Sequence, residues 1–407
     1  RSRSTGSWPT CRRGPGSAVL AGAARAVVAI GRRGKRVGRA VGRLGRRAVL
    51  AIAGAPRDGM RVFYGFPRVP APDESAVGGI VKVQRMQGRF PNAGWRFNLL
   101  YLVSSRLPHD AEALARLARA HGVRVVVNQN GVAYPAWHGP GWEETNVPMA
   151  RLLAAAEHVF YQSGFCKLSA DRFLGPPPAS WEILHNAVDT AVFTPAVRRD
   201  PAPLTLLVGG TQDLRYRVSV ALEVLALVAR SRPDVRMLIM GRLRWGTDPT
   251  SAAREAHRMA VELGVTDRVT FVGPYAQAEA PELYRRGHLL LHAKRNDPSP
   301  GLVVEAMACG LPVVYSASGG VPELVGPDAG IGAPAELRWE REIPPEPAAM
   351  AVAVLQVADR LAEFSEAARQ RAVERFGLDR WLDRHAEVFG ALLDGAAPAC
   401  PVGRAAP

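Results

Sequence analysis

The stretch NDPSPGLVVEAMACGLPVVYSASGGVPELV, residues 296–325, decides the fold. It follows an apolar run typical of a buried strand, and it contains a proline-rich loop, a helical segment that begins at Gly301, a second strand and a glycine turn. Glycine at a helix start lets the backbone come close to a ligand, and the free N–H groups there suit a diphosphate. The stretch therefore predicts an α/β corner that binds phosphate through Gly301, Leu302 and Val303.

The chain alternates between strand and helix patterns in two blocks. Apolar runs that indicate strands lie at residues 61–64, 97–103, 124–127, 159–161 and 181–184, and again at 204–208, 236–240, 269–272, 289–292 and 312–315. Helical spacing fills the intervals between them. Two such blocks predict an α/β protein with two doubly wound, Rossmann-like parallel sheets, with ligands at the carboxyl ends of the strands.

Length and composition agree with two folded domains. The 407 residues are too many for one compact core, and the 47% of apolar residues excludes a wholly disordered chain. We expect a basic extension over residues 1–58, an N-terminal domain over 59–190, a C-terminal domain over 191–375 and a disordered tail over 396–407.

The positive charge of the chain is concentrated at its start. Residues 1–58 hold fourteen Lys and Arg and one acid, so this segment accounts for +13 of the net charge of +15. The remaining chain is close to neutral, which argues against nucleic acid as a partner. In a helix, the apolar and basic residues of the segment 35–52 would lie on opposite faces, as in helices that lie on anionic membrane surfaces, so an anionic membrane surface is a candidate partner of residues 18–52. Its glycines disfavour such a helix, so membrane contact and a solvated tail both stay open.

The four cysteines are scattered, with no Cys-x-x-Cys pair and no histidine pair at metal spacing. We therefore expect neither disulfides nor a zinc site, and a reducing compartment, the cytoplasm, is the default. No run of about 18 uncharged apolar residues predicts a membrane-spanning helix.

Residues 305–325, EAMACGLPVVYSASGGVPELV, resemble the C-terminal-domain signature of glycosyltransferase family 4, retaining enzymes of the GT-B fold. In that family two glutamates frame seven residues, followed by a Gly-x-Pro-Val-Val strand and a Gly-Gly-x-Pro-Glu turn. Here Glu305 is the second acid, and Asp297 stands for the first with a side chain one methylene shorter. The resemblance assigns Glu305 to the ribose hydroxyls of the donor and Asp297 to the transferred sugar. Without it, a solvated helix residue is the favoured interpretation of a lone glutamate such as Glu305.

Other segments extend the resemblance over roughly residues 60–395. HNAVDTAVF, residues 185–193, is similar to the linker between the two domains of the family. The final helix, near 378–393, would cross back to the first domain, which residues 376–395 complete. Gly78 and Gly79 resemble the glycine loop beside the donor diphosphate. Thr211 stands where the family has an arginine, so the resemblance leaves the phosphate to Arg215 or Arg217, with the choice open. Further predicted donor contacts lie in the loop before Gly301, at Lys294.

The acceptor side is predicted in NQNGVAYPAWHGPGW, residues 128–142, where aromatic rings, amides and an imidazole suit sugar binding. We take Asn130 and Trp137 as acceptor-binding candidates, and His138 as a catalytic candidate beside Asp297. A turn-rich loop whose tryptophans only pack is the alternative.

These features predict a glycosyltransferase that moves a sugar from a nucleotide-sugar to a glycan, lipid or small-molecule acceptor with retention of configuration. The chain has no Asp-x-Asp motif, so we expect no metal and no cofactor. A non-catalytic GT-B sugar-binding or membrane-associated scaffold is the main alternative. A nicotinamide dehydrogenase is disfavoured because no Gly-x-Gly-x-x-Gly follows the first strand of either block.

Overall fold

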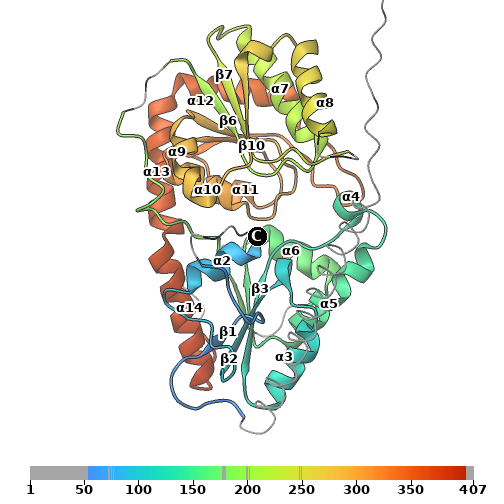
Figure 1. The fold of residues 1–407 in the computed structure, drawn as a ribbon, viewed down its shortest axis with the longest axis vertical. Helices are drawn as coiled ribbons and strands as arrows, with labels where there is room; N and C mark the ends of the chain where they lie inside the picture. The colour runs from blue at the N-terminus through green and yellow to red at the C-terminus, as the bar shows by residue number, and fades with distance from the viewer. Residues whose placement is uncertain are drawn as a thin grey trace, which may run out of the picture.

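The computed structural model describes residues 54–399, apart from residues 72, 73, 75, 77, 177–179, 199, 201, 247 and 249. Two parallel-sheet α/β domains lie one above the other along the long axis of the molecule (Figure 1). The predicted fold class is confirmed. The segment 18–52, for which membrane contact and a solvated tail both stay open, lies outside the described residues. None of the described helices is long and apolar enough to cross a membrane.

The N-terminal sheet contains five parallel strands in the order β1-β2-β3-β4-β5. Their bounds are β1 (Val62–Phe63), β2 (Leu99–Val103), β3 (Arg124–Gln129), β4 (His158–Tyr161) and β5 (Trp181–Ile183). Val62 also forms an isolated parallel bridge to Asn92. The segment at Asn92 therefore lies on one side of β1, and β2, which follows it in the chain, lies on the other side. This reversal places the switch point of the sheet, where ligands bind in such folds, beside β1.

Helices cover both faces of this sheet, which explains why its strands are buried runs rather than alternating ones. One face packs against α3 (Ala111–Ala120), α5 (Trp142–Ala155) and α6 (Gly164–Phe173). The other face packs against α2 (Gly79–Met86) and α14 (Leu378–Leu393).

The C-terminal sheet contains six parallel strands in the order β11-β10-β9-β6-β7-β8, which reverses between β6 and β9. Their bounds are β6 (Thr205–Val208), β7 (Arg236–Met240), β8 (Val269–Gly273), β9 (Leu289–His292), β10 (Val313–Ser316) and β11 (Gly330–Ala333). One face packs against α7 (Arg215–Ala229), α8 (Ser251–Glu262) and α12 (Pro347–Asp359). The other face packs against α9 (Ala280–Arg285), α10 (Gly301–Ala308), α11 (Val321–Val325) and α13 (Leu361–Phe376).

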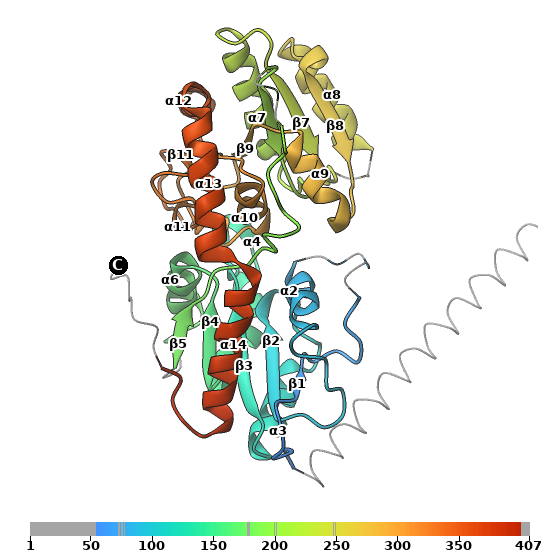
Figure 2. The same ribbon diagram turned by 90° about the vertical axis from the view of Figure 1, so that its left-hand side faces the viewer.

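The final helix, α14, crosses back to the N-terminal domain, as the resemblance implies (Figure 2). Its buried His385 lies 3.1 Å from the Tyr101 hydroxyl through Nε2, while Nδ1 lies 2.8 Å from the Trp381 carbonyl oxygen. At the start of this crossing, Gly377 forms a parallel bridge to Val188 of the interdomain linker. The two chain crossings between the domains therefore run side by side.

A second set of contacts joins the domains away from the linker. Trp339, in the loop between β11 and α12, is buried among Tyr134, Phe165 and Phe173 of the N-terminal domain. Glu323, on α11, accepts hydrogen bonds from backbone N–H groups at the start of α6, including one of 2.7 Å from Gly164. Both contacts hold the two domains against each other.

Candidate functional site

Two adjoining cavities lie between the domains, where the carboxyl ends of both sheets meet. The first has a volume of about 700 Å³ and the second about 510 Å³. Asn130 and Ser299 line both cavities, one residue from each domain. These two residues mark the junction at which a ligand in one cavity would meet a ligand in the other.

The loop that carries Asp297 and Ser299 is held by the glycine turn that follows β10. A Cβ atom at Gly320 would lie 2.1 Å from the Pro298 carbonyl oxygen, and one at Gly319 would lie 2.5 Å from that of Asp297. The Gly320 N–H donates to the Asp297 carbonyl at 2.9 Å. The two glycines are therefore required because two backbone segments lie in direct contact.

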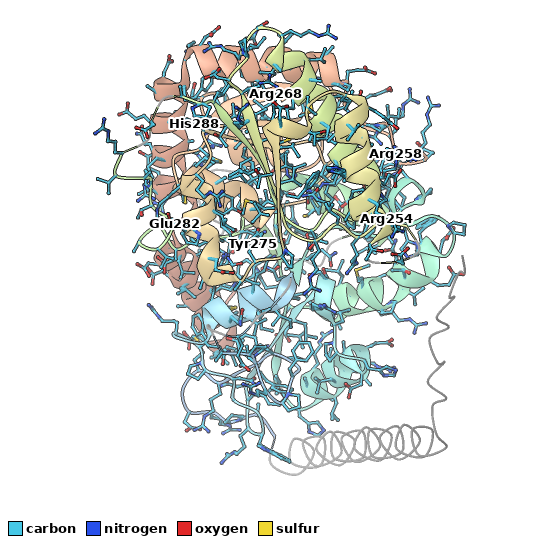
Figure 3. All side chains as sticks on the ribbon, turned by 45° about the horizontal axis from the view of Figure 1, so that its top comes forward. Arg254, Arg258, Arg268, Tyr275, Glu282 and His288 are labelled. Atoms are coloured by element: carbon cyan, nitrogen blue, oxygen red, sulfur yellow. The ribbon has the colours of Figure 1, made fainter. Side chains whose placement is uncertain are left out.

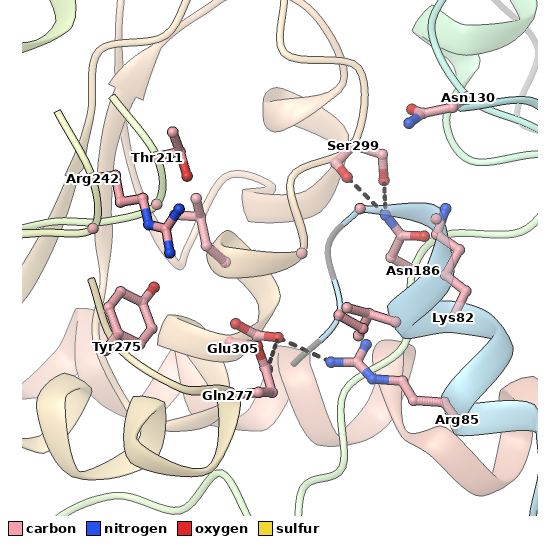
Figure 4. Close-up of a pocket in the computed structure, with 18 of the residues that line it drawn as sticks. Lys82, Arg85, Asn130, Asn186, Thr211, Arg242, Tyr275, Gln277, Ser299 and Glu305 are labelled. Carbon is pink, nitrogen blue, oxygen red and sulfur yellow. Dashed lines mark hydrogen bonds and ion pairs between the residues drawn. The ribbon is translucent and has the colours of Figure 1, made fainter. Parts of the chain in front are cut away.

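Glu305 points into the first cavity from α10, between residues of both domains (Figure 4). It is 8% exposed, which excludes the solvated-helix alternative. Its Oε1 atom accepts hydrogen bonds from Gln277 Nε2 at 3.0 Å and from Arg85 Nη2 at 2.9 Å, and Oε2 accepts one from the Tyr284 hydroxyl at 3.3 Å. The carboxylate is thus buried and held in place by neutral and cationic donors.

The first cavity is strongly cationic. Its lining includes Lys82, Arg85, Arg242 and Arg244, whereas Glu305 is the one carboxylate among its lining residues in the described part of the chain. The predicted glycines Gly78, Gly79 and Gly301, together with Leu302, line the same cavity. These residues lie at the starts of α2 and α10, whose positive dipole ends add to the cationic character.

Sequence reasoning missed Arg242 and Arg244, which directly follow β7. A Cβ atom at Gly241 would lie 2.2 Å from the Gly210 carbonyl oxygen, so this loop lies against the turn after β6. Backbone hydrogen bonds of 2.8 Å from Gln212 to Arg242 and from Arg244 to Gln212 fix the two loops together. Cations directly after a buried strand beside β6 were the signal that could have identified them.

Tyr275, which sequence reasoning also missed, lines the first cavity. Figure 3 shows it at the edge of the C-terminal domain that faces the N-terminal domain, whereas Arg254 and Arg258 lie on α8 at the outer surface. Burial raises the pKa of Tyr275 to about 12, so the phenol stays neutral. An aromatic face beside Arg242 is suited to stack on a planar ring.

The two arginines predicted to bind phosphate have other partners. Arg217 is buried, and its guanidinium donates to the Thr211 carbonyl at 2.7 Å and to the Gly209 carbonyl at 3.2 Å. Arg215 donates to Glu255 at 2.6 Å on the surface. Neither lines the two cavities. Their phosphate role stays a prediction, and this geometry assigns Arg217 to holding the turn.

The expected free N–H at Val303 is wrong. The Val303 N–H donates to the Pro300 carbonyl at 3.1 Å, because the first turn of α10 closes on the residue before Gly301. The Val303 side chain is fully buried in the core of the C-terminal domain.

The second cavity contains the predicted catalytic and acceptor residues, and also Lys294, which was predicted as a donor contact but does not line the first cavity. Asp297 and Lys294 line it from the C-terminal domain, and Trp137 and His138 line it from α4 (Pro135–His138). Trp137 is 61% exposed, so it is not a packing residue. His138 Nε2 lies 2.9 Å from the Thr145 hydroxyl.

Asp297 is buried and ionised. Burial alone would raise its pKa, but Lys294 at 3.4 Å, the His292 ring at 3.2 Å and the Arg217 charge outweigh burial and hold the pKa well below its usual range. Glu342 lines the same cavity, and burial raises its pKa. The cavity therefore offers the Asp297 carboxylate as a strong hydrogen-bond acceptor, and the Glu342 carboxyl group, which binds a proton more readily than a solvated glutamate does.

At the junction, the Asn130 N–H donates to the Ser104 hydroxyl at 2.9 Å. The buried Oδ1 atom of Asn130 has no hydrogen-bond partner among the described residues. No described group of three or more His, Cys, Asp or Glu side chains is placed to hold a metal ion.

Comparison with known proteins matches the C-terminal half of this site. A family model described as Glycosyl transferases group 1 matches residues 202–360. D-inositol 3-phosphate glycosyltransferases of Mycobacteroides abscessus and Mycolicibacterium gilvum are 33% identical over 158 residues and 34% identical over 157 residues, respectively. Each alignment covers 36% of this chain and 34% of the relative. The chain thus matches about a third of the length of these relatives.

Solved structures resemble the chain over a larger share. Anabaena HepE in complex with UDP has a TM-score of 0.59 at 19% identity, covering 72% of this chain and 79% of that one. Sucrose-phosphate synthase from Thermosynechococcus elongatus has a TM-score of 0.57 at 16% identity, covering 77% of each chain. These likenesses confirm the GT-B fold, in which two Rossmann-like domains face a cleft.

Proposed function

We propose that this protein is a retaining glycosyltransferase of family 4 that transfers a sugar from a nucleotide-sugar to an acceptor hydroxyl without a metal ion. The observation that carries the proposal is the composition of the first cavity. Four cations, Lys82, Arg85, Arg242 and Arg244, line it with one buried carboxylate, Glu305. A diphosphate is bound by cations, whereas vicinal ribose hydroxyls need a hydrogen-bond acceptor, and this cavity supplies both.

The donor would extend through the first cavity toward the junction. The ribose hydroxyls would donate to Glu305, and the base would stack on Tyr275 beside Arg242. The diphosphate would lie between the starts of α2 and α10, where two helix ends and the cationic side chains favour negative charge. The transferred sugar would then reach Asn130 and Ser299, and the acceptor would occupy the second cavity.

In the proposed reaction, the bond between the anomeric carbon and the diphosphate oxygen breaks as the acceptor oxygen bonds to the same face of that carbon. The diphosphate leaves with the electron pair, and its departing oxygen takes the proton of the acceptor hydroxyl. The cations of the first cavity stabilise the leaving group as its charge develops. Asp297 and His138 orient the hydroxyl groups of the sugar and the acceptor in the second cavity.

The matches to the family model and to the D-inositol 3-phosphate glycosyltransferases support transfer of a glycosyl group. These matches do not assign the acceptor of those relatives to this chain, because we predict the acceptor side in residues 128–142, which lie outside the residues matched by the family model, 202–360. The acceptor we propose is a polyhydroxylated molecule, since the second cavity combines carboxylates, an imidazole and an indole ring.

The proposal is tested by thermal unfolding of the purified chain with UDP-, GDP- and ADP-sugars. A true donor raises the melting temperature in the wild type, because ligand that binds only the folded state stabilises it. Glu305→Ala should lose this increase, whereas Glu366→Ala, an exposed glutamate on α13, should keep it.

Transfer itself is then followed by nucleoside diphosphate release with candidate acceptors. Donor binding without any release would favour the non-catalytic scaffold, and no binding of any donor would reject both the donor site and the enzyme.

A further inference from the structure

Lys82 is a buried cation without an anionic partner. Its side chain, on α2, is 9% exposed, and its Nζ atom donates to Asn128 Oδ1 at 3.2 Å. No carboxylate among the described residues forms an ion pair with it. The charged or titratable groups that face it are Arg85 on α2, the Cys166 thiol on α6 and the His385 ring on α14, whose low pKa keeps it neutral near pH 7. Buried lysines are normally paired, because leaving a buried ammonium unpaired is costly.

Neutral amides fix the position of this ammonium group without cancelling its charge. Asn128 Oδ1 also accepts a hydrogen bond of 2.6 Å from Gln162 Nε2. Asn186, in the linker, donates to Gln162 Oε1 at 3.3 Å and to the Ser299 carbonyl at 2.7 Å. The chain of amides thus runs from Lys82 in one domain to Ser299 in the other.

Lys82 lines the first cavity at its junction with the second. Figure 4 shows it beside Asn186, on the side of Ser299 and Asn130 and away from Thr211 and Arg242. A group bound there would lie where the two cavities adjoin.

We propose that Lys82 binds a phosphoryl group at the junction of the two cavities, and that this group supplies the missing counter-charge. The proposal rests on the proposed function and singles out, among the cations named there, one specific phosphate contact from the N-terminal domain. Two sources carry this chemistry: the diphosphate of the donor, or a phosphate ester on the acceptor. In either case the ammonium group contacts phosphate oxygen, and Asn128 keeps it directed into the cavity.

The proposal implies a dependence of binding on pH. Burial and, to a smaller extent, the neighbouring Arg85 charge together lower the pKa of Lys82 to about 7, so near neutral pH the free protein holds a mixture of ammonium and neutral amine. The Cys166 thiol, whose pKa burial raises to about 12, gives no negative charge near neutral pH. A bound phosphate favours the ammonium form, so binding should take up a proton above pH 7 and weaken as the pH rises further.

Calorimetry with the full chain tests this. The probes are UDP, GDP and ADP, their unphosphorylated nucleosides, glucose 6-phosphate and inorganic phosphate. The variants are Lys82→Met, Lys82→Arg and the control Arg119→Met, which removes an exposed cation from α3 of the same domain. Lys82→Met should fold at least as stably as the wild type, because it removes an unpaired buried charge.

If Lys82 binds the donor diphosphate, Lys82→Met should weaken nucleoside diphosphate binding at least tenfold and leave nucleoside binding unchanged. Lys82→Arg should recover part of the loss, and Arg119→Met should show none. The affinity of the wild type should fall between pH 7 and 9, whereas that of Lys82→Met should stay level. If Lys82→Met instead loses affinity only for glucose 6-phosphate, measured in the presence of saturating nucleoside diphosphate, the contact is to a phosphorylated acceptor.

Unchanged binding of every phosphorylated probe in Lys82→Met would overturn the proposal. Failure of the proposed function is a separate outcome, in which no nucleoside diphosphate binds the wild type. In that case inorganic phosphate still tests Lys82, because its binding should be lost in Lys82→Met, and equal binding by both proteins again overturns the proposal.

Discussion

The Arg85 guanidinium lies 2.9 Å from the Glu305 carboxylate, so an ion pair joins α2 of the N-terminal domain to α10 of the C-terminal domain. The two side chains are 17% and 10% exposed. Arg85 also donates to the carbonyl of Ala187 in the linker. The residue that we assign to the donor ribose is therefore also a domain contact, and a donor must share Glu305 with Arg85 or displace it.

Because this pair is buried, removal of one partner should leave an uncompensated charge. We expect Arg85→Met and Glu305→Gln each to lower the free energy of unfolding by about 3 kcal/mol, and the double variant to lose clearly less than the sum. Urea unfolding of the four proteins measures this coupling. Strictly additive losses would show that the ion pair does not stabilise the contact between the two domains.

Gly320→Ala should displace the loop that carries Asp297. The new methyl group would meet the Pro298 carbonyl oxygen at 2.1 Å, and backbone cannot move aside as a side chain can. We expect lower stability and lost donor-induced stabilisation, both measured by thermal unfolding. Gly390→Ala on α14 is the control, because a Cβ atom there meets no heavy atom within 4 Å. Equal behaviour of the two variants would contradict this account of the turn.

Trp339→Ala should separate the C-terminal-domain loop from the N-terminal core. Trp339 packs against Tyr134 and Phe165, and its carbonyl accepts a hydrogen bond of 2.8 Å from Ala136 of α4. We expect a loss of about 3–5 kcal/mol of unfolding free energy in urea titrations, as for other buried tryptophans. Trp95→Ala, at a position that is 52% exposed, should cost far less. A small effect at position 339 would mean that the loop does not hold the domains together.

Acid should weaken the docking of α14 through His385. Burial lowers the pKa of His385 to about 3, whereas an unfolded histidine titrates near 6.5, so below pH 6.5 the unfolded state takes up the proton first. The contribution of neutral His385 to stability is complete above pH 6.5 and is lost as the pH falls toward 3.

Urea unfolding at pH 7.5, 5.5 and 4.5 measures this loss. His385→Gln, which keeps an acceptor for the Tyr101 hydroxyl, should lose less unfolding free energy between pH 7.5 and 4.5 than the wild type does. His257→Gln, at an exposed site, should lose as much as the wild type. If His385→Gln loses as much unfolding free energy in acid as the wild type, the loss comes from other groups.

The fold could be predicted in most of its elements because long apolar runs, such as 289–292, are distinctive. β7, β9 and α14 occur at the predicted bounds. β11, whose sequence is GIGA, was missed because two glycines conceal an edge strand, and α11 was predicted as part of a turn. Local pattern fails where an element is short and its stability comes from neighbours.

The site could be predicted only where a motif is contiguous. The stretch around Glu305 identified one wall of the first cavity, but Arg85, Arg242 and Tyr275 come from separate segments that only the folded chain brings together. Trp339 gave no signal because its binding pocket belongs to the other domain. Arg217 was predicted from spacing as a phosphate ligand, while in the fold its guanidinium binds carbonyl groups of its own turn.

The parallel bridge between Val188 and Gly377 also limits how the molecule can move. Two polypeptide crossings that are hydrogen-bonded to each other resist twisting and sliding, and the Arg369 guanidinium binds the carbonyl groups of Thr190 and Phe193 beside them. A swing of one domain about this point, as in a hinged lid, would therefore disturb the two crossings least. Such a swing would separate Arg85 from Glu305 and widen both cavities at once, so entry of the proposed donor and of the proposed acceptor would depend on a single motion.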